Sequence, residues 1–161
     1  DKRRDKNWKI KDKVVTKSDT KKNTVSSTEK DFYKLWTSVT LRYGDTDRQG
    51  HINNAAYCTF FESGRVAFLC HEHGTIADDG FSFVIAKLSL DFLKEMNFPG
   101  TVDVGTRINH IGKSSFVCGQ ALYKNGECCS TAESVIVLTD DKTRRSSPLP
   151  EKVLAVLKEL Q

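Results

Sequence analysis

The sequence predicts one α+β domain in which a single long helix packs against antiparallel strands. First, 161 residues, of which 38% are hydrophobic, suffice for one domain with a substantial core. Second, apolar residues recur every three to four positions over one long segment, which is typical of an amphipathic helix. Third, four later segments alternate apolar and polar residues, which is typical of half-buried strands. Together these observations indicate a strand, a long helix and then four antiparallel strands.

The first elements of the domain are a strand and the long helix. Over residues 36–43, apolar side chains alternate with polar ones, which predicts a strand. Asn53 or Asn54 is a suitable N-cap, because a short amide side chain can accept hydrogen bonds from the free N–H groups of a helix start. Gly64 lowers helix stability by roughly 1 kcal/mol relative to Ala, so we expect another backbone to approach closely there. The helix runs to about Cys70, and its predicted inner face consists of Tyr57, Phe60, Phe61, Gly64, Phe68 and His71.

Four strands and a short helix are expected after the long helix. The predicted strands cover residues 82–92, 102–108, 116–123 and 128–138. Asn125 and Gly126 predict a type I′ hairpin between the last two strands, because both central residues of that turn need positive φ. A short amphipathic helix is expected over residues 151–160. A single sheet leaves open edges and one bare face, so we expect at least a dimer.

The N-terminal part differs in composition from the rest. Residues 1–34 are expected to form a flexible basic tail, because they hold 12 Lys or Arg against 6 Asp or Glu and show no sustained period. Residues 35–161 form the predicted domain and hold 13 Lys or Arg against 15 Asp or Glu. A nucleic-acid role would therefore depend on the tail alone, and we expect no nucleic-acid partner. We interpret the tail as a solvated extension, with a remnant of a targeting segment as the alternative.

Hydropathy and cysteine content restrict the environment of the chain. No apolar stretch approaches the ~20 residues that span a bilayer, so no membrane insertion is expected. Five cysteines are an odd number without a CxxC motif, and we interpret them as free thiols rather than disulfides or zinc ligands. These features predict a reducing intracellular compartment, either the cytoplasm or an organelle lumen such as that of a plastid or mitochondrion.

The loop between the first strand and the long helix carries the chemistry. It presents Asp45 and Asp47 just before a helix start. The unpaired N–H groups there, together with the helix dipole, stabilise negative charge on a nearby oxygen. A carboxylate that faces such donors can attack an activated carbonyl or activate water while the amides hold the oxyanion. We interpret Asp45 as a structural loop residue that pairs with Arg42 or Arg48.

This loop resembles that of the hot-dog-fold acyl-CoA thioesterases of the 4-hydroxybenzoyl-CoA thioesterase type. Their aromatic-x-Asp-x-Asp-x-x-Gly pattern corresponds to Tyr43-Gly44-Asp45-Thr46-Asp47-Arg48-Gln49-Gly50. The continuation Gly50-His51-Ile52-Asn53-Asn54 resembles the His-x-Asn-Asn signature of acyl-acyl-carrier-protein thioesterases. The resemblance implies a hot-dog fold, a five-stranded antiparallel sheet wrapped around a long central helix. It also implies a homodimer or tetramer that binds substrate at the subunit interface, without a cofactor or metal.

The resemblance also implies roles for individual residues. Asp47 matches the catalytic aspartate of the family, which acts as nucleophile or as base toward water. The backbone N–H of Asn54 matches the oxyanion donor. Glu62 resembles an acidic helix position that assists the site, and its alternative role is an i,i+3 pair with Arg65. His51 is a candidate for proton transfer, and its alternative role is to bond the loop backbone.

Candidate substrate-binding residues lie in two places. The turn Gly112-Lys113-Ser114-Ser115 resembles the turn over which related enzymes lay the phosphates of coenzyme A. Its lysine, hydroxyls and free amides suit phosphate. Tyr57 is a candidate to line the acyl pocket, and its alternative role is ordinary core packing.

The sequence therefore predicts a thioesterase that hydrolyses an acyl-thioester, preferably an acyl-CoA, to a free carboxylic acid and a thiol. The alternatives are an acyl-acyl-carrier-protein thioesterase, a non-catalytic module that binds acyl-CoA, and a hot-dog dehydratase or hydratase. The presence of Asp47 argues against the non-catalytic module. The position of His51, directly before the helix, differs from the placement expected in a dehydratase.

Overall fold

The structure, a computed structural model, describes residues 26–71 and 74–161. Its elements in chain order are η1 (Lys30–Phe32), β1 (Leu35–Thr40), η2 (Tyr43–Asp45), α1 (Asn54–Leu69), β2 (Cys70–His71), β3 (Gly74–Thr75), β4 (Phe81–Phe92), β5 (Thr101–Ile111), β6 (Ser115–Lys124), β7 (Glu127–Asp140) and α2 (Glu151–Glu159). The main elements confirm the predicted order of a strand, a long helix, four strands and a short terminal helix.

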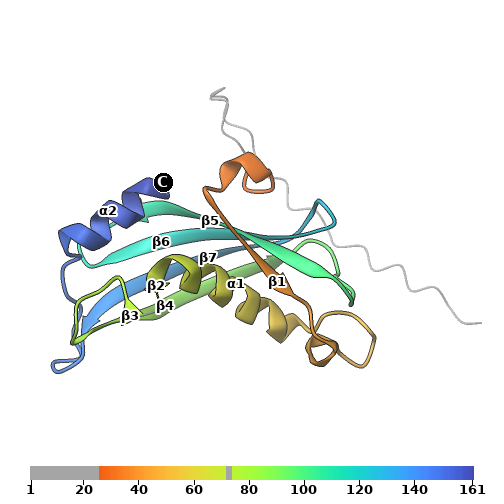
Figure 1. The fold of residues 1–161 in the computed structure, drawn as a ribbon, viewed down its shortest axis with the longest axis horizontal. Helices are drawn as coiled ribbons and strands as arrows, with labels where there is room; N and C mark the ends of the chain where they lie inside the picture. Colours follow the sequence, from red (N-terminus) through yellow and green to blue (C-terminus); the bar gives the residue numbers. More distant parts are fainter. Residues whose placement is uncertain (1–25, 72–73) are drawn as a thin grey trace, which may run out of the picture.

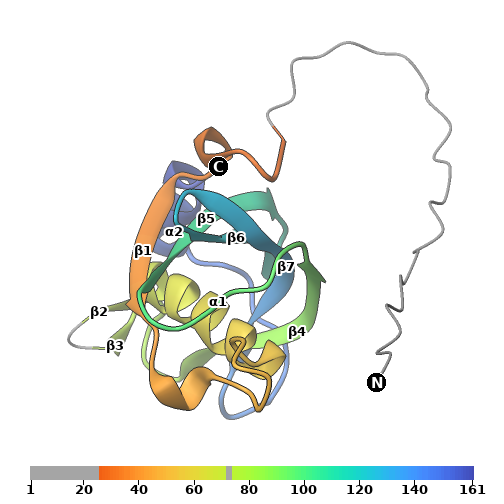
Figure 2. The ribbon, with the colours of Figure 1, turned by 90° about the vertical axis from the view of Figure 1, so that its right-hand side faces the viewer.

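Five strands form one antiparallel sheet in the order β1-β5-β6-β7-β4. The sheet curls around α1, which lies along its concave face (Figure 1). Seen from the end, the strands surround the helix on several sides, while β1 and β4 remain the two edges (Figure 2). This arrangement is the hot-dog fold that the sequence predicts.

Close contact between α1 and the sheet depends on a glycine. Phe60 and Phe61 are fully buried on the inner face of α1, and each contributes roughly 1.5–3 kcal/mol to folding. Gly64 follows one turn later and faces β5 and β6. A Cβ atom at Gly64 would lie 2.6 Å from both Gln120 Nε2 and Val104 Cγ1. Close packing at this glycine therefore involves side chains of β5 and β6, and not the second backbone that the sequence analysis expected.

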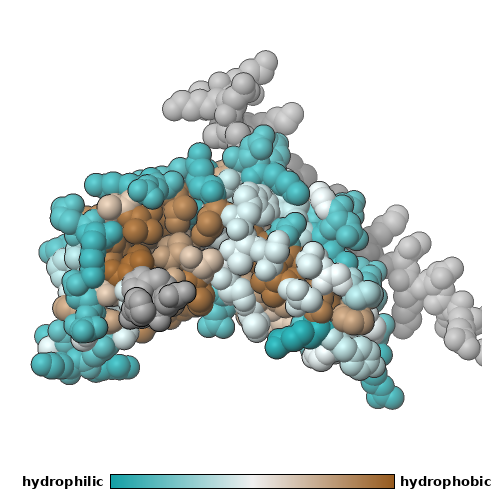
Figure 3. Space-filling view, in the orientation of Figure 1, coloured by the Kyte–Doolittle hydropathy of each residue, from teal (hydrophilic) through white to brown (hydrophobic). Residues whose placement is uncertain are grey.

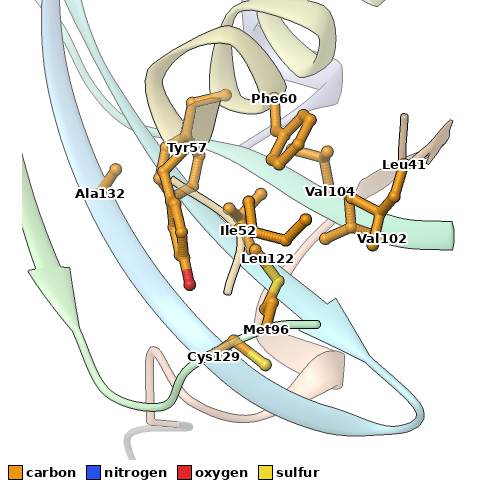
Figure 4. Packing of buried hydrophobic residues seen from close by; sticks show 11 residues of the cluster. Leu41, Ile52, Tyr57, Phe60, Met96, Val102, Val104, Leu122, Cys129 and Ala132 are labelled. Carbon is orange, nitrogen blue, oxygen red and sulfur yellow. The ribbon is translucent and has the colours of Figure 1, made fainter. Parts of the chain in front are cut away.

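A hydrophobic cluster supports the start of α1. The cluster contains side chains from α1 and from the sheet. It also contains side chains from two connecting segments, one before β5 and one before α1 (Figure 4). Met96, which follows β4, is 1% exposed and packs in this cluster. The backbone N–H of Ile52 donates to the Met96 carbonyl at 2.7 Å. The loop before α1 and the segment after β4 are thus held together over a packed core.

Local sequence signals account for most element boundaries. Asn125 and Gly126 have φ values of 53° and 84°, which confirms the predicted type I′ turn between β6 and β7. The first strand is shorter than predicted and ends at Thr40. The chain turns into η2 because the Asp45 carboxylate accepts a hydrogen bond from the Arg42 N–H at 2.8 Å. The two-residue strands β2 and β3 were not predicted, since two residues give no periodic pattern.

Residues 26–34, which the sequence analysis placed in the tail, lie against the sheet on the face opposite α1. Tyr33 is 6% exposed and packs on Ala121 and Tyr123. The Tyr123 hydroxyl donates to a backbone carbonyl of this segment at 2.6 Å. Gly105 makes room for the ring, because a Cβ there would lie 2.8 Å from Tyr33. Residues 1–25 lie outside the described residues, and a flexible tail stays a prediction for them.

The edge at β4 carries exposed apolar residues. Val84 and Ile85 are 38% and 48% exposed, and Val66 on the neighbouring face of α1 is 47% exposed. Apolar residues gather on this side of the molecule (Figure 3). An open strand edge with apolar side chains is a surface that proteins normally cover by pairing.

Candidate active site

The loop between β1 and α1 is organised around a buried carboxylate. Asp45 is 7% exposed, and its Oδ1 accepts a hydrogen bond from Arg42 Nη2 at 3.0 Å. Burial raises the pKa of Asp45, but the hydrogen bonds from the Arg42 side chain and backbone outweigh it and hold the pKa below its ordinary value. The Asp45 carbonyl also accepts from the Asn53 N–H at 2.8 Å. Asp45 therefore shapes the loop, with Arg42 as the partner that the sequence analysis named first.

Asp47 is half-buried at the tip of this loop. Its Oδ1 accepts hydrogen bonds from the Gln49 N–H at 2.7 Å and from the His51 N–H at 3.2 Å. Its own N–H donates to the His51 carbonyl at 2.8 Å. The second carboxylate oxygen, Oδ2, has no hydrogen-bond partner among residues 26–71 and 74–161. The loop thus fixes the carboxylate through one oxygen and leaves the other available.

The start of α1 supplies a backbone donor. Asn53 is the N-cap, and its side chain accepts from the Ala55 N–H at 3.0 Å. The N–H of Asn54, the first residue of the helix, makes no hydrogen bond within the part of the chain that the structure describes. The helix dipole adds partial positive charge at this position. The Asn54 N–H is therefore able to stabilise an anionic oxygen.

Asp47 and Asn54 line the same cavity, whose volume is about 320 Å³. The cavity lies between the loop, the first turn of α1 and the segment after β4. Tyr57 borders it and is 3% exposed, and its hydroxyl donates to the Lys94 carbonyl at 3.4 Å. Figure 4 shows this ring reaching from α1 across the cluster beside Ile52. The structure thus brings together the predicted acid, the predicted donor and a predicted pocket residue.

His51 borders this cavity together with a residue that the sequence analysis missed. Its Nε2 lies 3.3 Å from Glu95 Oε2, and both side chains line the cavity. A β-bridge between His51 and Asn97 brings the two segments together. The sequence holds no signal for this pair, because 43 residues separate its members and Glu95 belongs to no motif.

Glu62 lies on α1 but borders a different hollow. A groove of about 290 Å³ runs between α1 and β4, and Glu62, Val66, Phe83 and Ile85 help to line it. Arg65 is 5% exposed and donates through Nη1 to Gln120 Oε1 at 3.1 Å, so it points into the core. No salt bridge joins Glu62 to Arg65 among the described residues. Within one chain, Glu62 and Asp47 therefore line separate hollows.

The turn with Lys113, Ser114 and Ser115 lies far from Asp47 within one chain. The Asp47 loop adjoins the start of β5, where Thr40 pairs with Thr101. The turn follows the other end of β5, 11 residues later, which corresponds to roughly 35 Å. Figure 1 shows the turn and the loop at opposite ends of the sheet. The structure does not bring this turn to the cavity of its own chain.

Other predicted features concern cysteines, metals and membranes. All five cysteines are free, and burial raises the pKa of Cys118 to about 12. The described residues contain no group of three or more His, Cys, Asp or Glu side chains that could hold a metal. No α-helix in the described ranges is long and apolar enough to cross a membrane.

The fold and the cavity define a hot-dog domain in which a loop carboxylate and a helix N-terminus share one site. Residues 41–157 match the family described as the thioesterase-like superfamily. Because this match covers most of the chain, the protein belongs to that superfamily.

Individual relatives agree with this assignment. The chain is 24% identical over 125 residues to acyl-CoA thioester hydrolase YbgC of Escherichia coli, covering 75% of this chain and 93% of the relative. It is similar to a predicted thioesterase from Bacillus stearothermophilus, with 28% identity, a TM-score of 0.70 and coverage of 78% and 95% of the two chains. A thioesterase from Thermus thermophilus, complexed with coenzyme A and Zn, is 27% identical with a TM-score of 0.70 and coverage of 81% and 96%.

Proposed function

We propose that this protein hydrolyses acyl-CoA thioesters to the free carboxylic acid and coenzyme A. One observation carries the proposal: Asp47 and Asn54 line the same cavity, and within the described residues Asp47 Oδ2 and the Asn54 N–H have no hydrogen-bond partner. The superfamily match supports a thioester hydrolase, and the names of the relatives support acyl-CoA as the substrate class. The same arrangement suits the 4-hydroxybenzoyl-CoA type of hot-dog enzyme, with the His-x-Asn-Asn segment at the helix start.

In this mechanism the thioester carbonyl oxygen accepts a hydrogen bond from the Asn54 N–H. As nucleophile, Asp47 Oδ2 forms a bond to the carbonyl carbon, the C–S bond breaks and the thiolate leaves. Water then attacks the mixed anhydride, which releases the acid and regenerates the carboxylate. As base, Asp47 instead takes a proton from a water that attacks the same carbon, and the C–S bond then breaks as the thiolate leaves. In both routes the amide stabilises the oxyanion, and one such donor is typically worth roughly 3–4 kcal/mol of barrier lowering.

Proton transfer is proposed for His51. Its ring borders the cavity, and an Nε2–H directed at Glu95 leaves Nδ1 free to accept or return a proton. The departing thiolate needs a proton in both routes, and the water that attacks the mixed anhydride loses one in the nucleophilic route. Tyr57 is proposed to border the acyl group, because it is a buried aromatic wall of the cavity.

A second copy of the chain is proposed to pair with the open edge of β4. Antiparallel pairing of two β4 strands would place the Phe81 end of one strand beside the Phe92 end of the other. The groove that contains Glu62 borders the Phe81 end, whereas the cavity that contains Asp47 borders the Phe92 end. In such a homodimer Glu62 of one subunit would approach the cavity of its partner.

The turn after β5 belongs to the same proposal. Ser115 pairs with Val137, and Val137 pairs with Val84, so the turn lies at the Phe81 end of the sheet. Pairing of two β4 edges would therefore bring Lys113, Ser114 and Ser115 toward the partner's cavity, where they would suit the phosphates of coenzyme A. A tetramer of two such dimers is compatible with this arrangement.

A thiol-release assay on the full chain tests the proposed function. The substrates are short, long and aromatic acyl-CoAs, with an acyl-acyl-carrier-protein alongside. We expect steady thiol release and free acid from at least one acyl-CoA. Binding of acyl-CoA without release would indicate the non-catalytic module, and turnover confined to the carrier-protein substrate would contradict acyl-CoA as the substrate.

A further inference from the structure

A buried arginine on α1 has no anionic partner. The Arg65 side chain is 5% exposed, and its Nη1 donates to Gln120 Oε1 at 3.1 Å. Gln120 is neutral, and its Nε2 is already bound to the Phe61 carbonyl and to Thr106 Oγ1. No salt bridge reaches Arg65 among the described residues. Burial lowers the pKa of Arg65, because it removes the hydration of the guanidinium and a neutral amide does not offset the charge.

This arginine borders the groove between α1 and β4. Although its Nη1 points into the core, Arg65 is among the residues that line this hollow of about 290 Å³. Apolar surface gathers on this side of the molecule (Figure 3). Glu62 is the one carboxylate among the described residues that line the groove, and it is exposed and makes no salt bridge with Arg65. The other walls are mostly apolar and include Val66, Leu69, Phe81, Phe83, Ile85 and Ile136.

We propose that this groove binds the free carboxylate of a short- or medium-chain aliphatic acid, with Arg65 as the counter-ion and the hydrocarbon chain on the apolar walls. Arginine binds a carboxylate through two parallel N–H donors. Nε and Nη2 of Arg65 make no hydrogen bond among the described residues, so donors remain for such a pair. A volume of about 290 Å³ is at the lower end for small-molecule sites, which favours a short chain.

The site goes beyond the proposed function, because it requires a free acid and neither a thioester nor a reaction. A free acid is also what the proposed reaction releases, so the groove would give the product a binding site apart from Asp47 of the same chain. The groove lies at the β4 edge, where a second copy is proposed to pair. Pairing would shield the carboxylate and Arg65 from water, which strengthens the attraction between the two charges.

Titration calorimetry of the full chain with octanoate at low ionic strength tests this inference. The control ligand is 1-octanol, which has the same chain and no charge. Arg65→Met should weaken octanoate binding at least about tenfold, because hydrogen bonds to a charged group are lost, and should leave octanol binding unchanged. An apolar residue of similar volume often replaces a buried charge without loss of stability, and thermal unfolding checks that the variant is folded.

A second pair of variants tests the site even if Arg65→Met does not fold. Val66 lines the groove and is 47% exposed, so Val66→Glu adds a negative charge there and Val66→Gln is the uncharged control. Val66→Glu should weaken octanoate binding about fivefold relative to Val66→Gln, because like charges repel. Octanol should bind both variants equally.

Three results would overturn the inference. The first is equal affinity of the original protein for octanoate and octanol, which would indicate apolar contact alone. The second is octanoate binding that neither Arg65→Met, when folded, nor Val66→Glu changes. The third is no octanoate binding by the original protein, as expected if a second copy of the chain fills the groove.

Discussion

Replacement of Gly64 by alanine tests how the central helix is seated on the sheet. The new Cβ would lie 2.6 Å from Val104 Cγ1 and 2.6 Å from Gln120 Nε2. Gln120 cannot swing aside freely, because Nε2 donates to the Phe61 carbonyl at 2.9 Å and to Thr106 Oγ1 at 3.1 Å. The helix would have to move away from β5 and β6 or give up these hydrogen bonds.

The expected loss of stability follows from three contributions. Overpacking of a core costs about 1–3 kcal/mol, and a disturbed buried hydrogen bond costs about 1 kcal/mol more. Alanine regains about 1 kcal/mol in helix propensity. The net effect on the free energy of unfolding is a loss of roughly 2 kcal/mol, or about 4–8 °C in Tm for a domain of this size.

Denaturant and thermal unfolding of the full chain measure this loss, and Gly44→Ala is the matched control. No atom outside the neighbouring residues lies within 4 Å of a Cβ at Gly44, and its φ lies outside the range that favours glycine. The control should be neutral or slightly stabilising. If Gly64→Ala were as stable as the control, the conclusion that α1 packs closely on the sheet at this position would be contradicted.

Two further changes address the loop and the N-terminal segment. Asp45→Asn should lower the free energy of unfolding by about 1–3 kcal/mol at pH 7, because hydrogen bonds from Arg42 to an anion are lost. The pKa of Asp45 is depressed in the folded protein, so the difference in the free energy of unfolding should persist at pH values above the ordinary pKa and shrink as the pH falls below about 4. A difference that does not change with pH would contradict a stabilising role of the Asp45 anion. Deletion of residues 1–34 should lower Tm by roughly 5 °C or more, because Tyr33 and its contacts on the sheet are lost. Deletion of residues 1–25 alone should not lower Tm. Equal Tm values for the two truncated chains would refute the packing of Tyr33 on the sheet.

The sequence predicts those parts of the fold that depend on neighbouring residues. The cap at Asn53, the turn at Asn125 and Gly126, and the alternation within the strands are local patterns, and the structure has them. Gly64 also carried a usable signal, since a glycine inside a helix requires a packing reason.

The sequence patterns do not predict contacts between residues that lie far apart in the sequence. Tyr33 belongs to no periodic apolar pattern and packs into space left by Gly105, 72 positions away in the sequence. Glu95 comes near His51 only because two loops meet above the core.

In the candidate site, too, the sequence predicts what depends on neighbouring residues and does not predict what depends on distant ones. The loop motif places Asp47 and Asn54 on one cavity, because both lie within a short stretch of chain next to the same helix start. Glu62 and Lys113 were grouped with them by resemblance, yet one borders another groove and the other follows the far end of β5. The roles proposed for them require the proposed second chain, and no pattern within one chain encodes its position.

The most direct test of the account is the kcat of Asp47→Asn with an acyl-CoA that the original protein hydrolyses. We predict a fall of at least about 100-fold with an unchanged Tm, since the substitution removes the reacting carboxylate and keeps its shape. Asp79→Asn, at an exposed aspartate outside the cavity, should retain full activity. Substantial turnover by Asp47→Asn would contradict the assignment of this carboxylate as the catalytic group.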